Sequence, residues 1–164
     1  MLEGAKLELA MMAIALFVSV LSSAASAEEM PGGKEAMFKI KMTYADVVVT
    51  ATLYDNATTR WLRNKLPLTI PMMNRYGREL VYRFPEALPT DNVSVRSYEV
   101  GEIVYYPPLH SFVILYAQNG EKFSMQRLGH IEAGLENFEN ADDISLTIEN
   151  AGKRIIDSDF CSTL

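Results

Sequence analysis

The chain has 164 residues, of which 49% are apolar and 22% charged, a composition typical of a single globular domain with a hydrophobic core. Its 15 Lys and Arg residues stand against 21 Asp and Glu residues, and the net charge of −6 excludes the basic surface of a general nucleic-acid binder. The single cysteine, Cys161, excludes an internal disulfide and a multi-cysteine zinc site.

Residues 1–27 predict an export signal. Residues 9–21 (LAMMAIALFVSVL) are uncharged and almost entirely apolar, and Ala25-Ser26-Ala27 follows as a cleavage site. This run is shorter than the roughly 20 residues that cross a bilayer core, which favours cleavage after Ala27 over a permanent anchor. We therefore expect a secreted or periplasmic protein, in contact with a membrane only if the signal segment stays uncleaved.

The rest of the chain divides into three parts. Residues 28–37 begin with charged residues, a proline and a glycine pair, which is typical of a flexible leader. A regular alternation of apolar and polar residues then begins, and we expect one barrel domain over residues 38–150. Residues 151–164 form a polar C-terminal tail.

The domain opens with a predicted hairpin. Residues 38–44 and 47–54 each carry apolar side chains at every second position, and pairing Tyr44 with Val47 brings both apolar rows onto one side. The two-residue loop then begins with Ala45, although alanine is disfavoured where such a turn needs a positive φ.

A short helix is predicted next, capped by Asp55 or Asn56 and ended by Pro67. Further strands are predicted at residues 68–73, 80–84, 103–106, 112–117, 123–131 and 144–148. Short strands without regular helices between them favour an antiparallel barrel or sandwich, and a closed barrel also removes exposed strand edges. The predicted fold class is therefore mainly β: a closed antiparallel barrel of about eight strands with two short helices.

Four segments follow one another in an informative order: LYDNATT at residues 53–59, LPLT at 66–69, VGEIVYYP at 100–107 and LGHIEAGL at 128–135. The last has the layout of a strand followed by a helix that a glycine opens. This order resembles the cyclophilin-like domain of bacterial exported proteins, a relative of the cyclophilin peptidyl-prolyl isomerases. The resemblance covers roughly residues 38–149 and implies an eight-stranded barrel closed by two helices, with a groove on its outer wall.

The resemblance also nominates Arg83. Cyclophilins place an arginine beside an apolar pocket, in a segment of the form F-H-R, where the guanidinium donates toward the prolyl nitrogen and so stabilises the twisted amide. Val81, Tyr82 and Arg83 align with that segment, but the aromatic residue and the histidine are replaced. Arg83 is thus the catalytic candidate if the protein is an isomerase. The alternative is an arginine on the solvent face of a strand.

An aromatic-rich stretch supplies the rest of the candidate site. Strands that carry large residues at successive positions must point one face away from the barrel interior, and we expect that outer row to form a binding wall. The candidate ligand-binding residues are Arg83, Tyr82, Tyr105, Phe112 and Tyr116.

Charge is unevenly distributed along the chain. Residues 60–83 contain six basic residues and one acid, whereas residues 84–164 contain five basic residues and thirteen acids. An acidic peptide or an anionic small molecule would be attracted to the basic stretch. The alternative interpretation is an ordinary solvated face.

Other residues predict no further chemistry. His110 and His130 lack a pattern of carboxylates around them, so no metal and no cofactor are expected. Ser111 and Ser124 lie in no hydrolase motif. We expect an exported, monomeric binding module for a peptide segment or small ligand, without catalytic activity. The alternatives are a peptidyl-prolyl isomerase that acts on exported proteins through Arg83, and an accessory or assembly domain.

Overall fold

The computed structural model describes residues 37–152. The predicted export signal, almost all of the leader and most of the C-terminal tail lie outside the described residues, so the predictions made for them are untested. Within residues 37–152, no helix is long and apolar enough to cross a membrane.

The described residues form nine strands, one α-helix and two 3-10 turns. The strands are β1 (Met37–Tyr44), β2 (Val47–Tyr54), β3 (Leu68–Arg75), β4 (Glu79–Arg83), β5 (Val93–Arg96), β6 (Glu102–Tyr106), β7 (Ser111–Leu115), β8 (Phe123–Ala133) and β9 (Ile144–Asn150). The helix is α1 (Ala57–Lys65), and the two 3-10 turns are η1 (Pro107–Leu109) and η2 (Leu135–Phe138).

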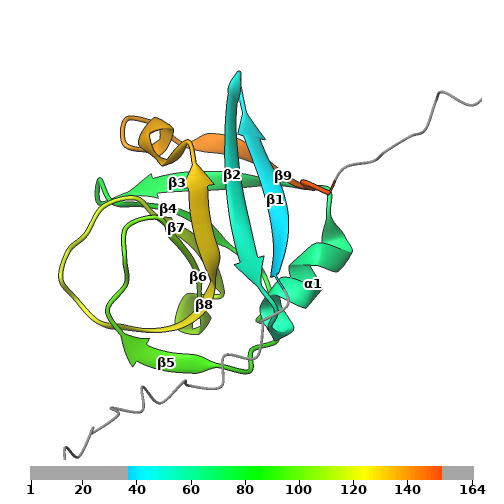
Figure 1. The fold of residues 1–164 in the computed structure, drawn as a ribbon. Coiled ribbons are helices and arrows are strands. Elements are labelled where there is room, and N and C mark those ends of the chain that lie inside the picture. The colour runs from blue at the N-terminus through cyan, green and yellow to red at the C-terminus, as the bar shows by residue number, and fades with distance from the viewer. Residues whose placement is uncertain (1–36, 153–164) are drawn as a thin grey trace, which may run out of the picture. The chain divides into compact units, whose positions relative to one another are not determined.

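Eight of the strands close into an antiparallel barrel (Figure 1). Neighbouring strands follow the order β2-β1-β9-β3-β4-β7-β6-β8, and a further pairing of β8 with β2 completes the ring. The predicted fold class is confirmed. Strand β5 lies outside the ring and pairs with the first part of β8. The sequence did not predict β5, which is only four residues long and largely exposed.

The β1–β2 hairpin has the predicted register, with Tyr44 opposite Val47. Ala45 adopts a φ of +44°, a conformation that costs an alanine more than a glycine. The two strands nevertheless pair along their whole length, from Met37 opposite Tyr54 to the turn. The strand pairing therefore sets the geometry of the turn, and the unfavourable turn residue adapts to it.

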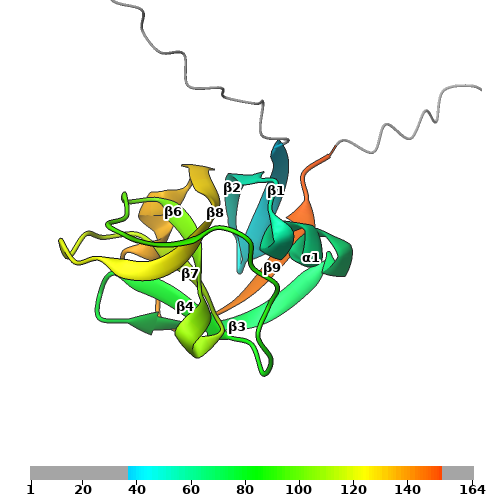
Figure 2. The same ribbon diagram turned by 90° about the horizontal axis from the view of Figure 1, so that it is seen from below.

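Apolar side chains from alternate strand positions fill the barrel interior, and α1 and η2 lie at opposite ends of β1 (Figures 1 and 2). Leu62 of α1 is 3% exposed and packs into the core. Phe138 of η2 is fully buried, and its ring lies 5.7 Å from that of Tyr44. The second predicted helix is thus a single 3-10 turn, which Gly134 opens at a φ of +91°.

Closure of the ring depends on β8. Gly129 and His130 pair with β2 on one side and with β6 on the other, and both ladders contain an irregularity in register. A Cβ atom at Gly129 would clash with the carbonyl oxygen of Thr52 and lie 2.8 Å from the Cα atom of Leu53. Both contacts are with backbone, which has little room to move. Only glycine therefore lets β2 and β8 approach this closely.

Substitution of Gly129 tests this crossing. Gly129→Ala is expected to lower the free energy of unfolding by about 3 kcal/mol or more, because the β2 backbone must shift to admit a methyl group. Urea unfolding followed by circular dichroism measures the loss. Gly152→Ala is the matched control, since nothing lies within 4 Å of the added Cβ atom, and it should change stability by less than about 0.5 kcal/mol. Equal stability of the two variants would contradict the close crossing.

Candidate functional site

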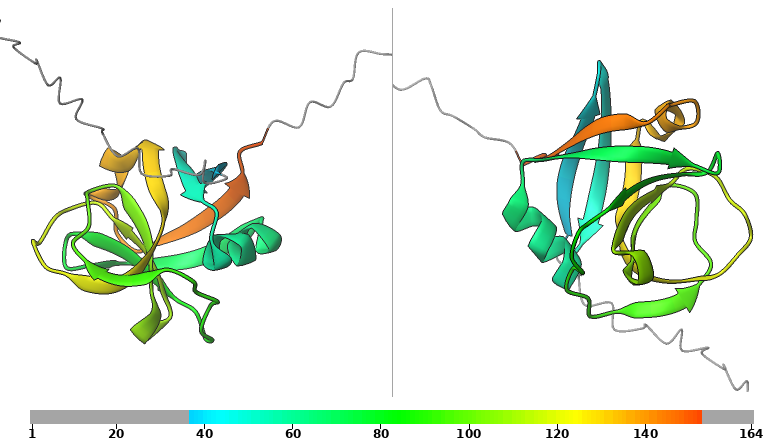
Figure 3. Two further views of the ribbon diagram at one scale, coloured as in Figure 1. Left: turned by 60° about the horizontal axis from the view of Figure 1, so that its bottom comes forward. Right: turned by 180° about the vertical axis from the view of Figure 1, so that it is seen from behind.

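The outer face of the barrel carries a second apolar cluster. Successive side chains of a strand point to opposite faces, so the neighbours of core residues in β4, β6 and β7 point outward. The buried members of this cluster are Val81, Tyr98, Val104, Val113, Leu115 and Met125. Tyr98 lies in the connection between β5 and β6, which runs beside the β7–β8 connection (Figures 1 and 3). Its hydroxyl donates to the Ala117 carbonyl at 3.0 Å and links the two connections.

A pocket of about 370 Å³ opens over this cluster; we call it the outer pocket. Strand register arranges much of its lining in three rows that run across the strands. The rows are Arg75, Glu79 and Leu115, then Met73, Val81, Val113 and Val104, then Arg83, Ser111 and Tyr106. Adjacent rows are two residues apart along each strand, or about 7 Å. The outer pocket is therefore apolar in the middle and polar at both ends.

An ion pair occupies one end of the outer pocket. The carboxylate of Glu79 lies 3.5 Å from Nε of Arg78, and both side chains are less than one-fifth exposed. The Arg78 guanidinium also lies 5.2 Å from the ring centre of Tyr76 and 5.5 Å from that of Phe123, positions that favour a cation over an aromatic ring. Burial raises the pKa of Glu79, and the neighbouring Arg78 opposes this shift. The two charges largely offset one another.

Two other arginines line the outer pocket without a carboxylate partner in the described part of the chain. The Arg83 guanidinium forms no hydrogen bond or ion pair with residues 37–152, and Arg75 donates only to the Met73 sulfur, at 3.1 Å. Arg75 pairs across the strands with Glu79, four residues before Arg83. Arg75 and Arg83 therefore lie in the two outer rows, and these rows are about 13 Å apart in the direction of the strands.

The structure separates the five predicted site residues. Arg83 lines the outer pocket and is the only one of the five that does. The remaining four lie in the strands or directly after β7, and they pack in or against the barrel core on the other side of the wall: Tyr82, Tyr105, Phe112 and Tyr116. The wall that we expected to be aromatic is thus built mainly by the residues next to these aromatic side chains, with Val104 and Val113 at its centre.

The aromatic residues on the core side have structural contacts. The Tyr105 hydroxyl is buried and accepts the backbone N–H of Leu88 at 2.8 Å. The Tyr116 hydroxyl donates to the side-chain oxygen of Asn74 at 2.6 Å. The ring of Tyr82 meets that of Phe84 edge to face, with 4.9 Å between their centres. These side chains hold the β4–β7–β6 wall from behind, while the outer pocket lies on its other side.

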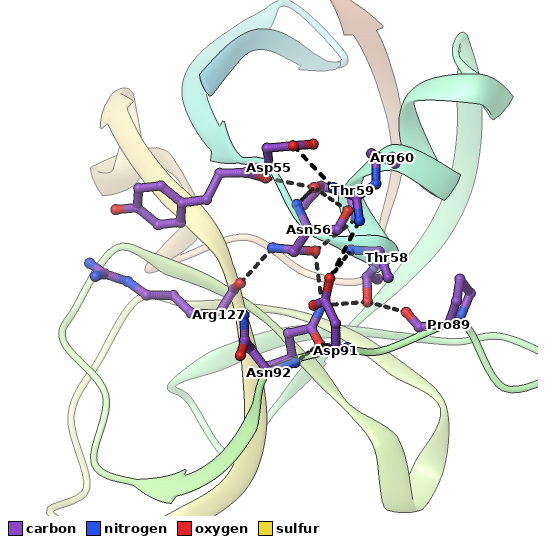
Figure 4. Close-up of polar contacts among 12 residues, drawn as sticks. Asp55, Asn56, Thr58, Thr59, Arg60, Pro89, Asp91, Asn92 and Arg127 are labelled. Carbon is purple, nitrogen blue, oxygen red and sulfur yellow. Dashed lines mark hydrogen bonds and ion pairs between the residues drawn. The ribbon is translucent and has the colours of Figure 1, made fainter. Parts of the chain in front are cut away.

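A second concentration of polar groups surrounds the start of α1 (Figure 4). The Asn56 side-chain oxygen accepts the backbone N–H of Thr59 at 3.0 Å and caps the helix, as the sequence predicted. Gln126 is fully buried; its Nε2 atom donates to Asn56 and Thr58 at 2.8 Å, and its Oε1 atom accepts two backbone N–H groups of the β4–β5 connection.

Every hydrogen-bonding position of the Gln126 amide is thus used within the protein. Because buried polar groups that are fully paired rigidify a structure, we interpret this cluster as a brace. It ties α1 and the β4–β5 connection to β8, next to Met125 of the outer pocket. The described residues contain no group of three His, Cys, Asp or Glu side chains that could hold a metal ion.

Gln126→Leu tests the brace. The substitution removes four hydrogen bonds of a fully buried amide: those from two backbone N–H groups of the β4–β5 connection and those to Asn56 and Thr58. We expect the free energy of unfolding to fall by about 3 kcal/mol. Chemical unfolding measures this change. Lys122→Leu, on the exposed connection that precedes β8, is the control and should stay within about 0.5 kcal/mol of the unchanged protein. A comparable effect of both substitutions would show that the Gln126 bonds contribute little.

Comparison with known proteins identifies the family. Residues 42–149 match the cyclophilin-like family, and the chain belongs to it. A solved structure with the same fold is the hypothetical protein AF2241 from Archaeoglobus fulgidus, with 18% identity and a TM-score of 0.58 over 73% of this chain and 99% of that protein. No curated protein sequence matches the chain.

McbB, solved in complex with tryptophan, also shares the fold. Its identity is 14% and its TM-score 0.56, over 71% of this chain and 46% of McbB. This chain therefore spans less than half the length of McbB. At such identities the two solved structures show a common architecture alone, and function has to be argued from the site.

Proposed function

We propose that the protein is a binding module whose outer pocket holds a small ligand or a peptide segment. The observation that carries this proposal is the outer pocket itself, a concave site of about 370 Å³ with an apolar floor and polar groups at both ends. Small-molecule sites in proteins have this combination and volumes of about 300 to 1,000 Å³. The outer pocket lies near the lower limit of that range, which favours a small ligand or a few residues of a peptide.

The groups that line the outer pocket support binding more than catalysis. The Ser111 hydroxyl is buried and donates to the Leu109 carbonyl at 2.9 Å, so its proton is directed at a backbone oxygen and not at a basic side chain of residues 37–152. Among residues 37–152, no histidine or cysteine lines the outer pocket. The export signal predicted at residues 1–27 adds the location: we propose a secreted or periplasmic monomer.

Prolyl isomerisation is the second candidate, and the place of Arg83 favours it. An isomerase of the cyclophilin type needs a guanidinium beside an apolar pocket, and Arg83 lies in the row next to Val81 and Val113. Valine replaces the aromatic residue that holds the proline ring in cyclophilins. We therefore expect the protein to bind a ligand without catalysing prolyl isomerisation.

Protein-observed NMR tests the binding function. Titration with tryptophan and a set of small apolar carboxylates and amides should shift backbone signals of β4, β6 and β7. Val113→Phe fills the floor of the outer pocket and should weaken binding at least tenfold, about 1.4 kcal/mol. Val48→Phe is the control, because Val48 is 56% exposed and lies on β2. If no probe shifts these strands, the binding function is wrong.

A protease-coupled assay on a proline-containing peptide separates the two candidates. We expect no rate above that in buffer alone. A measurable rate that disappears in Arg83→Ala would instead establish the isomerase.

A further inference from the structure

We propose that the ligand is a small apolar molecule with one anionic group, a carboxylate or its equivalent, which Arg83 holds. This inference rests on the proposed binding function and adds the chemical class of the ligand. It follows from the charges around the outer pocket, from the neighbours of Arg83 and from the order of the three rows.

The outer pocket is positive on a protein that is negative overall. Three arginines and one glutamate line it, whereas the whole chain has a net charge of −6. Arg78 and Glu79 largely offset one another, so Arg75 and Arg83 supply the excess charge. A positive pocket with low-dielectric walls attracts anions, while the negative remainder of the surface repels them.

Arg83 is the better of the two anchors. Its guanidinium has no partner in residues 37–152, and its row neighbour Ser111 donates to a backbone carbonyl. Arg75, by contrast, donates to the Met73 sulfur at 3.1 Å, and it lies across the strands from Glu79, in the row that the Arg78–Glu79 ion pair occupies. A carboxylate that approaches the Arg83 end meets an unpaired planar guanidinium, which binds such groups through two parallel hydrogen bonds.

The middle row determines the rest of the ligand. From Arg83, the next row along the strands offers only the apolar side chains of Met73, Val81, Val104 and Val113. An apolar part of the ligand that covers this row is removed from water and gives up no hydrogen bonds. This burial of apolar surface stabilises the complex. An apolar body of one or two rings or a short alkyl chain, with an anion at one end, matches this order of surfaces.

A matched pair of probes tests the inference. Indole-3-propionate and indole-3-propionamide have nearly the same size, and only the first is charged. We expect the carboxylate to bind at least tenfold more tightly than the amide, by calorimetry at low ionic strength, and the difference to shrink when salt is added.

Two variants locate the charge that matters. Arg83→Met should reduce the affinity for the carboxylate to that for the amide and leave the amide unaffected. Arg63→Met removes the same charge from α1, where the guanidinium lies 5.1 Å from the Phe38 ring, and should preserve the preference. A full loss of preference in Arg63→Met would mean that overall charge acts, and a loss in Arg75→Met with none in Arg83→Met would place the anion at the other end. Either result overturns the inference.

The remaining outcomes separate the inference from the binding function beneath it. Equal affinity of the unchanged protein for both probes would overturn the anionic ligand and leave the binding function standing. No binding of either probe, together with unshifted β4, β6 and β7 signals for all the apolar probes, would overturn both.

Discussion

At Gly129 the backbones of β2 and β8 come close enough to pair, and this pairing turns a curved sheet into a closed barrel. Closure gives every strand of the ring an inside and an outside. The inside is filled from alternate positions and sealed at its ends by α1 and η2. Stability therefore comes from one face of each strand, which leaves the other face free for another role.

On most of the ring that other face meets water, but over β4, β6 and β7 it is apolar as well. Tyr98 of the β5–β6 connection and Phe123, the first residue of β8, pack there with their ring centres 6.3 Å apart. The Gln126 brace holds β8 from the opposite side, next to Met125. A rigid barrel wall thus forms the floor of a pocket, and charged residues near the ends of β3 and β4 form its polar limits. Loops and strand ends at the edge of a rigid scaffold are a common location for binding residues.

Much of the fold was predictable because its signals are local. The β1–β2 register follows from a clean alternation of apolar and polar residues, and the Asn56 cap follows from the residue types that accept a helix N–H. The family resemblance, carried by the order of its segments, is confirmed over residues 42–149. The short edge strand β5 lacked such a signal, since a four-residue exposed segment shows no clear period.

The site was harder to predict for a physical reason. Strands β6 and β7 are buried on both faces, one in the core and one under the outer pocket, so nearly all their residues are apolar. Periodicity then cannot tell inside from outside. Large aromatic residues such as Tyr105 and Phe112 belong to the core, and smaller valines form the pocket floor. The family resemblance nominated Arg83, and its place on the outer face follows because a charge on a strand must point away from a sealed core. Its role stays a prediction.

Strand β7 divides a sealed core from an open pocket, with successive side chains on opposite sides. The most direct test of this division is to substitute lysine at two adjacent positions of β7 and to measure the unfolding of each variant in urea. Ile114→Lys places an ammonium group in the barrel core and is expected to abolish the folded state. Val113→Lys lets the side chain extend through the outer pocket to water, and should lower the free energy of unfolding by no more than about 2 kcal/mol. Equal losses at the two positions would contradict the account.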